Sequence, residues 1–75
     1  MEKKAFQKKL GKHIIRLRER QNLSQSDLAR ACEKDRQSIE RIENGKTNPT
    51  AHYLFQIAQA LKINPKEIFN FDSKD

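Results

Sequence analysis

Four polar residues between positions 37 and 44 recur at the spacing that places side chains on one face of an α-helix: Gln37, Glu40, Arg41 and Asn44. Arg and Gln carry flat, fork-shaped groups that can form two hydrogen bonds to one base edge, Arg with guanine and Gln with adenine. The major groove of B-DNA is about 12 Å wide and accepts one α-helix. The pattern therefore predicts a helix that reads base pairs. The alternative is an ordinary solvated face of charged residues.

Two charged residues next to this face allow more than one interpretation. Arg36 lies in the first turn of the expected helix, where it can either read a base or hold a phosphate. Glu40 is an acid close to the expected phosphates. It can pair with Arg36, accept a hydrogen bond from a cytosine amino group, or simply be tolerated, and we favour the pairing.

The helix that carries this face is expected over residues 36–44. Asp35 can cap its first turn, and Asn44-Gly45 can end it in a left-handed turn. Ile39 and Ile42 form its inward face. The preceding residues, Glu33-Lys34, are expected to form a tight turn.

A second short helix is expected before that turn, over residues 25–32. Ser24 and Asp27 have the spacing of a capping box, which marks a helix start. Leu28, Ala29 and Cys32 share one face of this helix. A redox switch at Cys32 is one hypothesis, but its apolar neighbours favour a small buried residue. The two helices and their turn together predict a helix-turn-helix.

The remaining sequence predicts three further helices and no strand. A helix over residues 2–21 has an apolar stripe and one glycine, Gly11, that lets a neighbouring helix come close. Thr50 can cap a fourth helix, and Asn64-Pro65 can open a fifth. The predicted fold is therefore all-α, a compact bundle of five helices. The inward residues of the first and fourth helices are Phe6, Leu10, Ile14, Leu17, Leu54, Ile57, Ala58 and Leu61.

The length of 75 residues predicts one domain spanning 1–75, with a core of about residues 5–70 and a loose tail at 71–75. A single Cys excludes a disulfide within the chain and a metal site built from several cysteines. No apolar run approaches the ~18 residues of a membrane helix, so we expect a cytoplasmic protein. No catalytic constellation or metal site is recognisable, which predicts no enzyme activity and no cofactor.

Positive charge is concentrated at the start of the chain. Residues 1–20 contain eight basic and two acidic residues, and therefore carry the whole net charge of +6, whereas the other 55 residues balance. A basic segment beside a helix-turn-helix is suited to contact with DNA phosphates. The alternative is a solvated helix surface, and part of the charge can have only that role.

These motifs resemble the phage repressor/Cro-like helix-turn-helix family, known as the Xre group. The resemblance runs from about residue 10 to residue 69, and its most telling parts are IIRLRERQNLSQSDLA, QSIERIENGKTNP and IAQALKINPKEIF. Any one part alone is weak, but their combination in one register is specific. The resemblance implies a lambda-repressor-like fold that binds double-stranded operator DNA, usually as a symmetric dimer.

The resemblance also implies roles for individual residues. It places base readers at Arg36, Gln37 and Arg41. It implies DNA backbone contacts at Gln25, Ser38, Asn44, Lys46 and Thr47, and a small residue at the helix crossing where Ala29 stands. It implies a structural pair between Arg18 and Glu43. The chain departs from the family pattern at Glu33, where a Gly usually takes a left-handed conformation, so Glu there is expected to cost about 1 kcal/mol.

Three functions are compatible with these features. The first is a sequence-specific DNA-binding regulator that acts as a repressor or autoregulator. The second is an antitoxin or other interaction module that binds a toxin or another protein partner. The third, an RNA-binding module, is disfavoured because the RNA major groove is too narrow for a helix. One helix reads few base pairs, so a homodimer is expected, with its interface at Ile63, Phe69 and Phe71.

Overall fold

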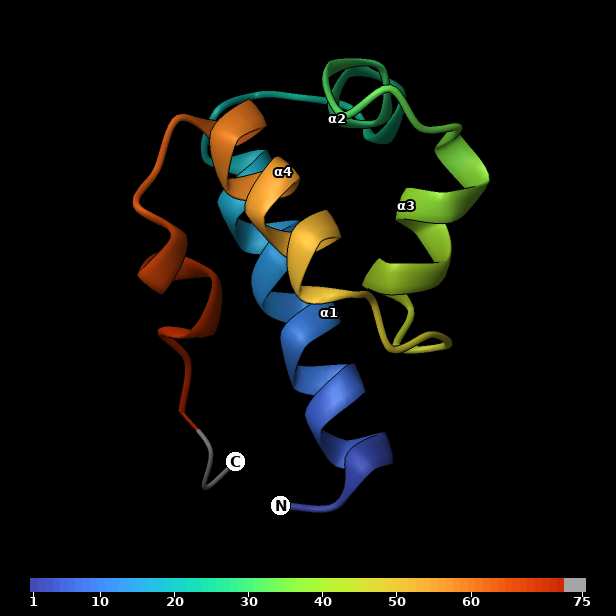
Figure 1. Cartoon of the computed structure of the whole chain (residues 1–75), viewed down its shortest axis with the longest axis vertical. Helices are drawn as coiled ribbons and strands as arrows, with labels where there is room; N and C mark the ends of the chain where they lie inside the picture. Colours follow the sequence, from blue (N-terminus) through green and yellow to red (C-terminus); the bar gives the residue numbers. More distant parts are fainter. Residues whose placement is uncertain (73–75) are drawn as a thin grey trace.

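The computed structural model describes residues 1–72, and residues 73–75 of the predicted tail at 71–75 lie outside them. Within this range four α-helices are followed by a short 3-10 helix (Figure 1). Their bounds are Lys3–Glu19 for α1, Gln25–Ala31 for α2, Arg36–Glu43 for α3, Ala51–Leu61 for α4 and Pro65–Phe69 for η1. The α2–α3 pair is the predicted helix-turn-helix, and its two helices end within one residue of their expected limits.

The prediction of five α-helices is wrong at its last element. Residues 65–69 form a 3-10 helix, in which the Asn70 amide donates to the Glu67 carbonyl three residues earlier. Asn64 caps this turn through the Lys66 amide, and Pro65 stands at its start, both as predicted. A segment of only five residues completes little more than one turn, and short segments commonly adopt this tighter form.

The helices surround one apolar core. In Figure 1, α1 runs through the middle of the molecule, α4 lies in front of it, α3 stands to one side and the C-terminal segment to the other. No helix within residues 1–72 is both long and apolar enough to cross a membrane. The fully buried side chains come from every helix: Leu10, Ile14, Leu28, Ile39, Ile42, Ile57, Leu61 and Ile68.

Local capping signals set the helix boundaries as the sequence predicts. Ser24 and Asp27 form a reciprocal capping box, in which the Ser24 hydroxyl accepts from the Asp27 amide and Asp27 accepts from the Ser24 amide. Asp35 caps α3 and Thr50 caps α4. Glu33 has a φ of 58°, the left-handed conformation that its place in the turn requires. The turn is therefore built with a residue that is strained there.

Gly11 allows α1 to touch the end of α3. A Cβ atom at this position would lie 2.5 Å from the carbonyl oxygens of both Ile42 and Glu43. Backbone atoms cannot move aside as a flexible side chain can, so only glycine fits this crossing. The close approach holds α3 against the middle of α1, as the sequence predicts from Gly11.

We predict that Gly11→Ala destabilises the protein. Alanine should gain about 1 kcal/mol of helix propensity, but the backbone clash should cost more, which leaves a net loss of roughly 2 kcal/mol. Chemical denaturation followed by circular dichroism measures this difference. The matched control is Lys12→Ala, at the exposed neighbouring position, which should change the free energy of unfolding by less than about 0.5 kcal/mol. Equal stabilities of the two variants would contradict the assignment.

Candidate nucleic-acid interface

The outward face of α3 is a polar surface with an open centre. Gln37, Arg41 and Asn44 are exposed on it. With Glu40 and Lys46 they line a shallow depression of about 290 Å³, which we call the α3 hollow. Two of the three predicted base readers, Gln37 and Arg41, thus lie together here. Both side chains are exposed to solvent, so the edge of a base could contact them.

Arg36 lies apart from this hollow, at the start of α3. Its Nη1 atom donates to the Gln25 side-chain oxygen at 3.1 Å and lies 3.7 Å from Glu40 Oε1. The pairing of Arg36 with Glu40 that we favoured is therefore present. Since Gln25 begins α2, these contacts place the Arg36 guanidinium between the first turns of α2 and α3, beside a residue expected to contact the DNA backbone.

A buried carboxylate lies behind the exposed face. The Glu43 side chain is only 1% exposed. Arg18 donates two hydrogen bonds to its carboxylate, from Nε at 2.7 Å and from Nη2 at 3.0 Å. The remaining Arg18 nitrogen donates to the Leu23 carbonyl at 2.8 Å. The hydrogen bond to Glu43 raises the pKa of Arg18, against the effect of burial.

Gln25 connects this buried pair to the surface. Its amide nitrogen donates to Glu43 Oε1 at 2.9 Å, while its oxygen accepts from Arg36. Four residues from three helices therefore form one chain of hydrogen bonds, Arg18–Glu43–Gln25–Arg36. The chain fixes how α3 sits against α1 and α2, and it holds the Arg36 side chain in place.

Ser38 makes a contact that the sequence did not suggest. Its hydroxyl is half-buried and forms a hydrogen bond of 2.7 Å with the Tyr53 hydroxyl of α4. Burial raises the pKa of Tyr53 above its ordinary value. Lys34 lies over the Tyr53 ring, 5.0 Å from its centre. Ser38 thus joins α3 to α4.

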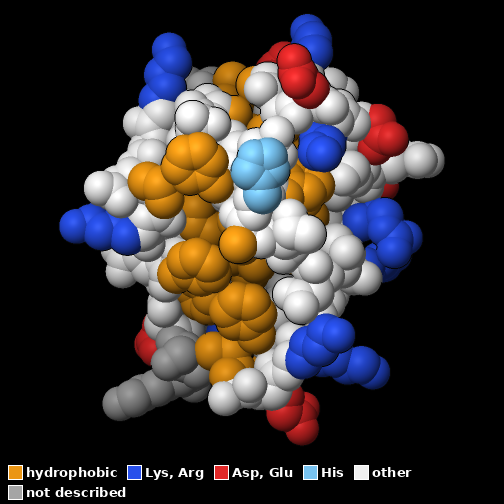
Figure 2. Space-filling view, viewed as in Figure 1, with side chains coloured by type: hydrophobic (Ala, Val, Ile, Leu, Met, Phe, Trp, Pro, Cys, Tyr) orange, Lys and Arg blue, Asp and Glu red, His pale blue; other side chains and the backbone are white. Residues whose placement is uncertain are grey.

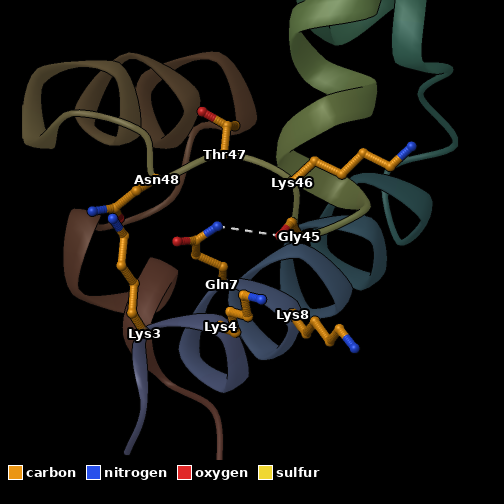
Figure 3. Close-up of a pocket in the computed structure, with 8 residues that line it drawn as sticks. All are labelled: Lys3, Lys4, Gln7, Lys8, Gly45, Lys46, Thr47 and Asn48. Carbon is orange, nitrogen blue, oxygen red and sulfur yellow. Dashed lines mark hydrogen bonds between the residues drawn. The ribbon is translucent and has the colours of Figure 1, made fainter.

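A second depression lies beside the α3 hollow, between the start of α1 and the loop after α3 (Figure 3). It measures about 490 Å³, and we call it the basic hollow. The sequence places its lysines within the basic segment but does not single them out. The lining residues are Lys3, Lys4, Gln7, Lys8, Gly45, Lys46, Thr47 and Asn48.

Cys32, for which a redox switch is one hypothesis, and His52 both have ordinary surroundings. Cys32 is buried with the core, and burial raises the pKa of its thiol. The reactive thiolate is therefore disfavoured at neutral pH, which supports the packing interpretation. His52 is exposed near the start of α4. Among the described residues, no cluster of His, Cys, Asp and Glu side chains could hold a metal ion.

The fold agrees with comparisons to known proteins. The helix-turn-helix family HTH_3 matches residues 14–68. The chain belongs to this family. The predicted resemblance to Cro-like regulators is therefore confirmed. The HTH_3 family is one of transcription regulators.

Individual relatives are similar along most of the chain. An uncharacterized HTH-type transcriptional regulator of Sinorhizobium fredii is 31% identical over 84% of this chain and 82% of its own. A second one, from Methanocaldococcus jannaschii, is 35% identical over 72% of this chain and 82% of its own. The crystal structure of the restriction-modification controller protein C.AhdI from Aeromonas hydrophila matches with a TM-score of 0.88 at 32% identity. That match covers 92% of this chain and all of the other.

We predict that Arg18→Ala lowers the free energy of unfolding by about 3–5 kcal/mol, because it leaves the buried Glu43 carboxylate without a charged partner. Denaturant titration at low temperature, where the variant retains most structure, measures the loss. Arg16→Ala is the control, since Arg16 is exposed on the same helix and should change stability by less than about 0.5 kcal/mol. A similar small change for both variants would show that the Arg18–Glu43 pair does not hold the fold.

Proposed function

We propose that this protein is a sequence-specific regulator of transcription that inserts α3 into the major groove of double-stranded DNA. The observation that supports this most directly is the exposed pair Gln37 and Arg41 on a short helix whose inner side is held by the buried Glu43 carboxylate. A helix held in this way presents its base-reading groups from a fixed backbone. The protein then loses less conformational entropy when it binds DNA.

Residues at both ends of α3 are suited to hold the two DNA backbones that border the groove. At one end, Gln25 and Arg36 are already in contact and offer N–H donors to a phosphate. At the other end, Asn44 and Lys46 line the α3 hollow, and Thr47 follows in the loop. In this arrangement Arg36 takes the phosphate role, while Gln37 and Arg41 read bases between the two backbone contacts.

Selection of bound duplexes from a random library tests the proposal and identifies the operator sequence in the same experiment. We expect one enriched motif after several rounds, because α3 contributes at least two base-specific contacts. Loss of enrichment with Gln37→Ala and Arg41→Ala combined, with an unchanged circular dichroism spectrum, would link the motif to α3. A folded wild-type protein that enriches no motif would contradict the proposal.

We predict that Gln37→Ala and Arg41→Ala relax specificity, whereas Lys46→Ala weakens binding evenly. Each base reader should lose about 1–3 kcal/mol of discrimination, and only at its own base pair. The measurement compares each variant on the selected duplex and on all single-base changes of it. If Arg41→Ala loses the same factor on every duplex, Arg41 contacts the backbone and the assignment is wrong.

An apolar groove on another face supports a homodimer. Figure 2 shows hydrophobic side chains gathered on the side where α4 faces the viewer. Phe55 and Phe69 are 45% and 52% exposed. Together with four other residues they line a groove of about 90 Å³ between α4 and η1: Ala51, Leu54, Pro65 and Ile68. Large exposed aromatic residues of this kind are typical of interfaces.

This groove refines the predicted interface. Ile63 and Phe71 are half-buried and pack against the core of their own subunit, so less of their surface is available to a partner. The Phe71 ring lies 6.0 Å from Phe6 and 5.5 Å from His13 between ring centres. Phe69 stays at the centre of the proposed interface, joined by Phe55. A two-fold dimer would place the two α3 helices about 34 Å apart, one turn of DNA.

We predict that Phe69→Asp converts dimer to monomer, because the interface would bury a charge without a partner. Sedimentation over a concentration series measures the change in mass, and half-sites in the selected DNA should be about 10–11 base pairs apart. Gln59→Asp, at an exposed position of α4 outside the groove, should leave the mass unchanged. A wild-type protein that remains monomeric both alone and on the selected duplex would overturn the dimer.

A regulator of this kind acts as a repressor or autoregulator when its operator overlaps a promoter. The likeness to a restriction-modification controller protein, which covers 92% of this chain and all of the other, supports a regulatory role. Because two subunits are needed at one site, operator occupancy should rise steeply with protein concentration. Such a response suits control of the protein's own expression.

A further inference from the structure

The basic hollow is continuous with the face proposed to read DNA. Lys46 lines both the basic hollow and the α3 hollow. A third depression on α1 shares Lys8 with the basic hollow and Asn44 with the α3 hollow. The three depressions therefore meet around the end of α3. A ligand that covers the α3 hollow can extend over the start of α1.

Charge in the basic hollow is of one sign. Four lysines line it and no acidic residue does: Lys3, Lys4, Lys8 and Lys46. Two of them, Lys3 and Lys4, lie in the first turn of α1, where the helix dipole disfavours cations, and Lys8 lies one turn further on. The first turn carries no acid, and the N-cap residue Glu2 makes no side-chain capping bond. Lys3 and Lys4 are therefore unfavourably placed in the free protein, whereas an anion in the hollow would be surrounded by four positively charged side chains.

The floor of the hollow is fixed by the packing of the loop on α1. Buried Gln7 donates from its side-chain nitrogen to the Gly45 carbonyl at 3.2 Å, the bond drawn in Figure 3. Gly45 has a φ of 70°, and a Cβ there would lie 2.9 Å from Lys8 Cα. The loop therefore sits directly on the backbone of α1. The lysines of α1 and Lys46 are held around one space.

We infer that the basic hollow binds a phosphodiester group of the DNA strand that flanks the base pairs read by α3. The inference rests on the proposed function, because the α3 hollow must be covered by DNA for the strand to continue over Lys46. The chemistry of the lining supports a phosphate in a polymer. It offers ammonium groups and small polar groups, and no aromatic side chain on which a free nucleotide base could stack.

This contact assigns different roles to the two ends of the basic segment. Lys3, Lys4 and Lys8 hold the strand and extend the DNA footprint beyond the helix-turn-helix. Arg16 lies two turns further along α1 and lines a separate depression with Phe71 of the C-terminal segment. Arg20 caps the C-terminal end of α1, the end away from the hollow. We therefore expect the arginines at that end to contribute little to DNA binding.

The test compares two double variants of the full-length protein, Lys4→Gln/Lys8→Gln and Arg16→Gln/Arg20→Gln. Both remove two positive charges four residues apart from exposed positions in or next to α1. Binding to the selected duplex is measured over a range of salt concentrations. The lysine variant should show a salt slope shallower by about 0.9 per subunit and roughly tenfold weaker binding near 0.1 M salt. The loss should be equal on selected and scrambled duplexes, and the arginine variant should resemble wild type.

Ethylation of single phosphates locates the contact. We expect wild-type binding to be blocked by ethylation of one phosphate outside the selected motif, and the lysine variant to be insensitive to that modification. Equal salt slopes for the two double variants would overturn the inference and leave DNA binding itself intact. A wild-type protein that binds no duplex would overturn the proposed function as well. Inorganic phosphate that shifts the amide signals of Gln7 and Gly45, with no flanking phosphate needed on DNA, would also overturn it in favour of a small-anion site.

Discussion

The structure depends on one buried negative charge. Glu43 ends α3, and its carboxylate receives hydrogen bonds from Arg18 on α1 and from Gln25 on α2. A carboxylate removed from water is unfavourable unless its partners compensate for the lost hydration, so the three helices must meet in one geometry to satisfy it. The pair therefore specifies the arrangement more than it stabilises it. The outward face of α3 is therefore held in a fixed orientation relative to α1 and α2.

The glycines make this meeting of helices possible. Gly11 lets the end of α3 reach α1, and Gly45 turns the chain at once so that the next loop lies on Lys8. At both positions the glycine lies so close to backbone atoms of the neighbouring element that a Cβ atom would not fit. Close backbone contact at two points leaves α3 little freedom to move relative to α1. The proposed DNA contacts on α3 and on the start of α1 are thus parts of one rigid surface.

Much of this arrangement could be predicted from local sequence. Ser24, Asp35 and Thr50 are recognisable as caps because a cap acts within three residues of its own position. The outward face of α3 follows from helical spacing alone, whereas the Arg18–Glu43 pair comes only from the family resemblance. The short 3-10 helix is missed because Pro65 and its neighbours carry the same start signals as an α-helix. The Ser38–Tyr53 bond and the Gln7–Gly45 bond join residues 15 and 38 positions apart, and no periodic pattern reports such pairs.

In this chain, buried residues provide the stability and exposed residues provide the proposed base reading. The residues that hold the fold, such as Ile39 and Glu43, face inward on α3, while Gln37 and Arg41 face outward on the same helix. Exposed substitutions usually change stability by less than about 0.5 kcal/mol, so the outward pair can change without loss of the fold. The start of α1 differs, because its lysines oppose the helix dipole in the free protein. A bound phosphate would offset this unfavourable interaction between the lysines and the helix dipole. DNA binding should therefore stabilise the start of α1 as well as neutralise the charges of its lysines.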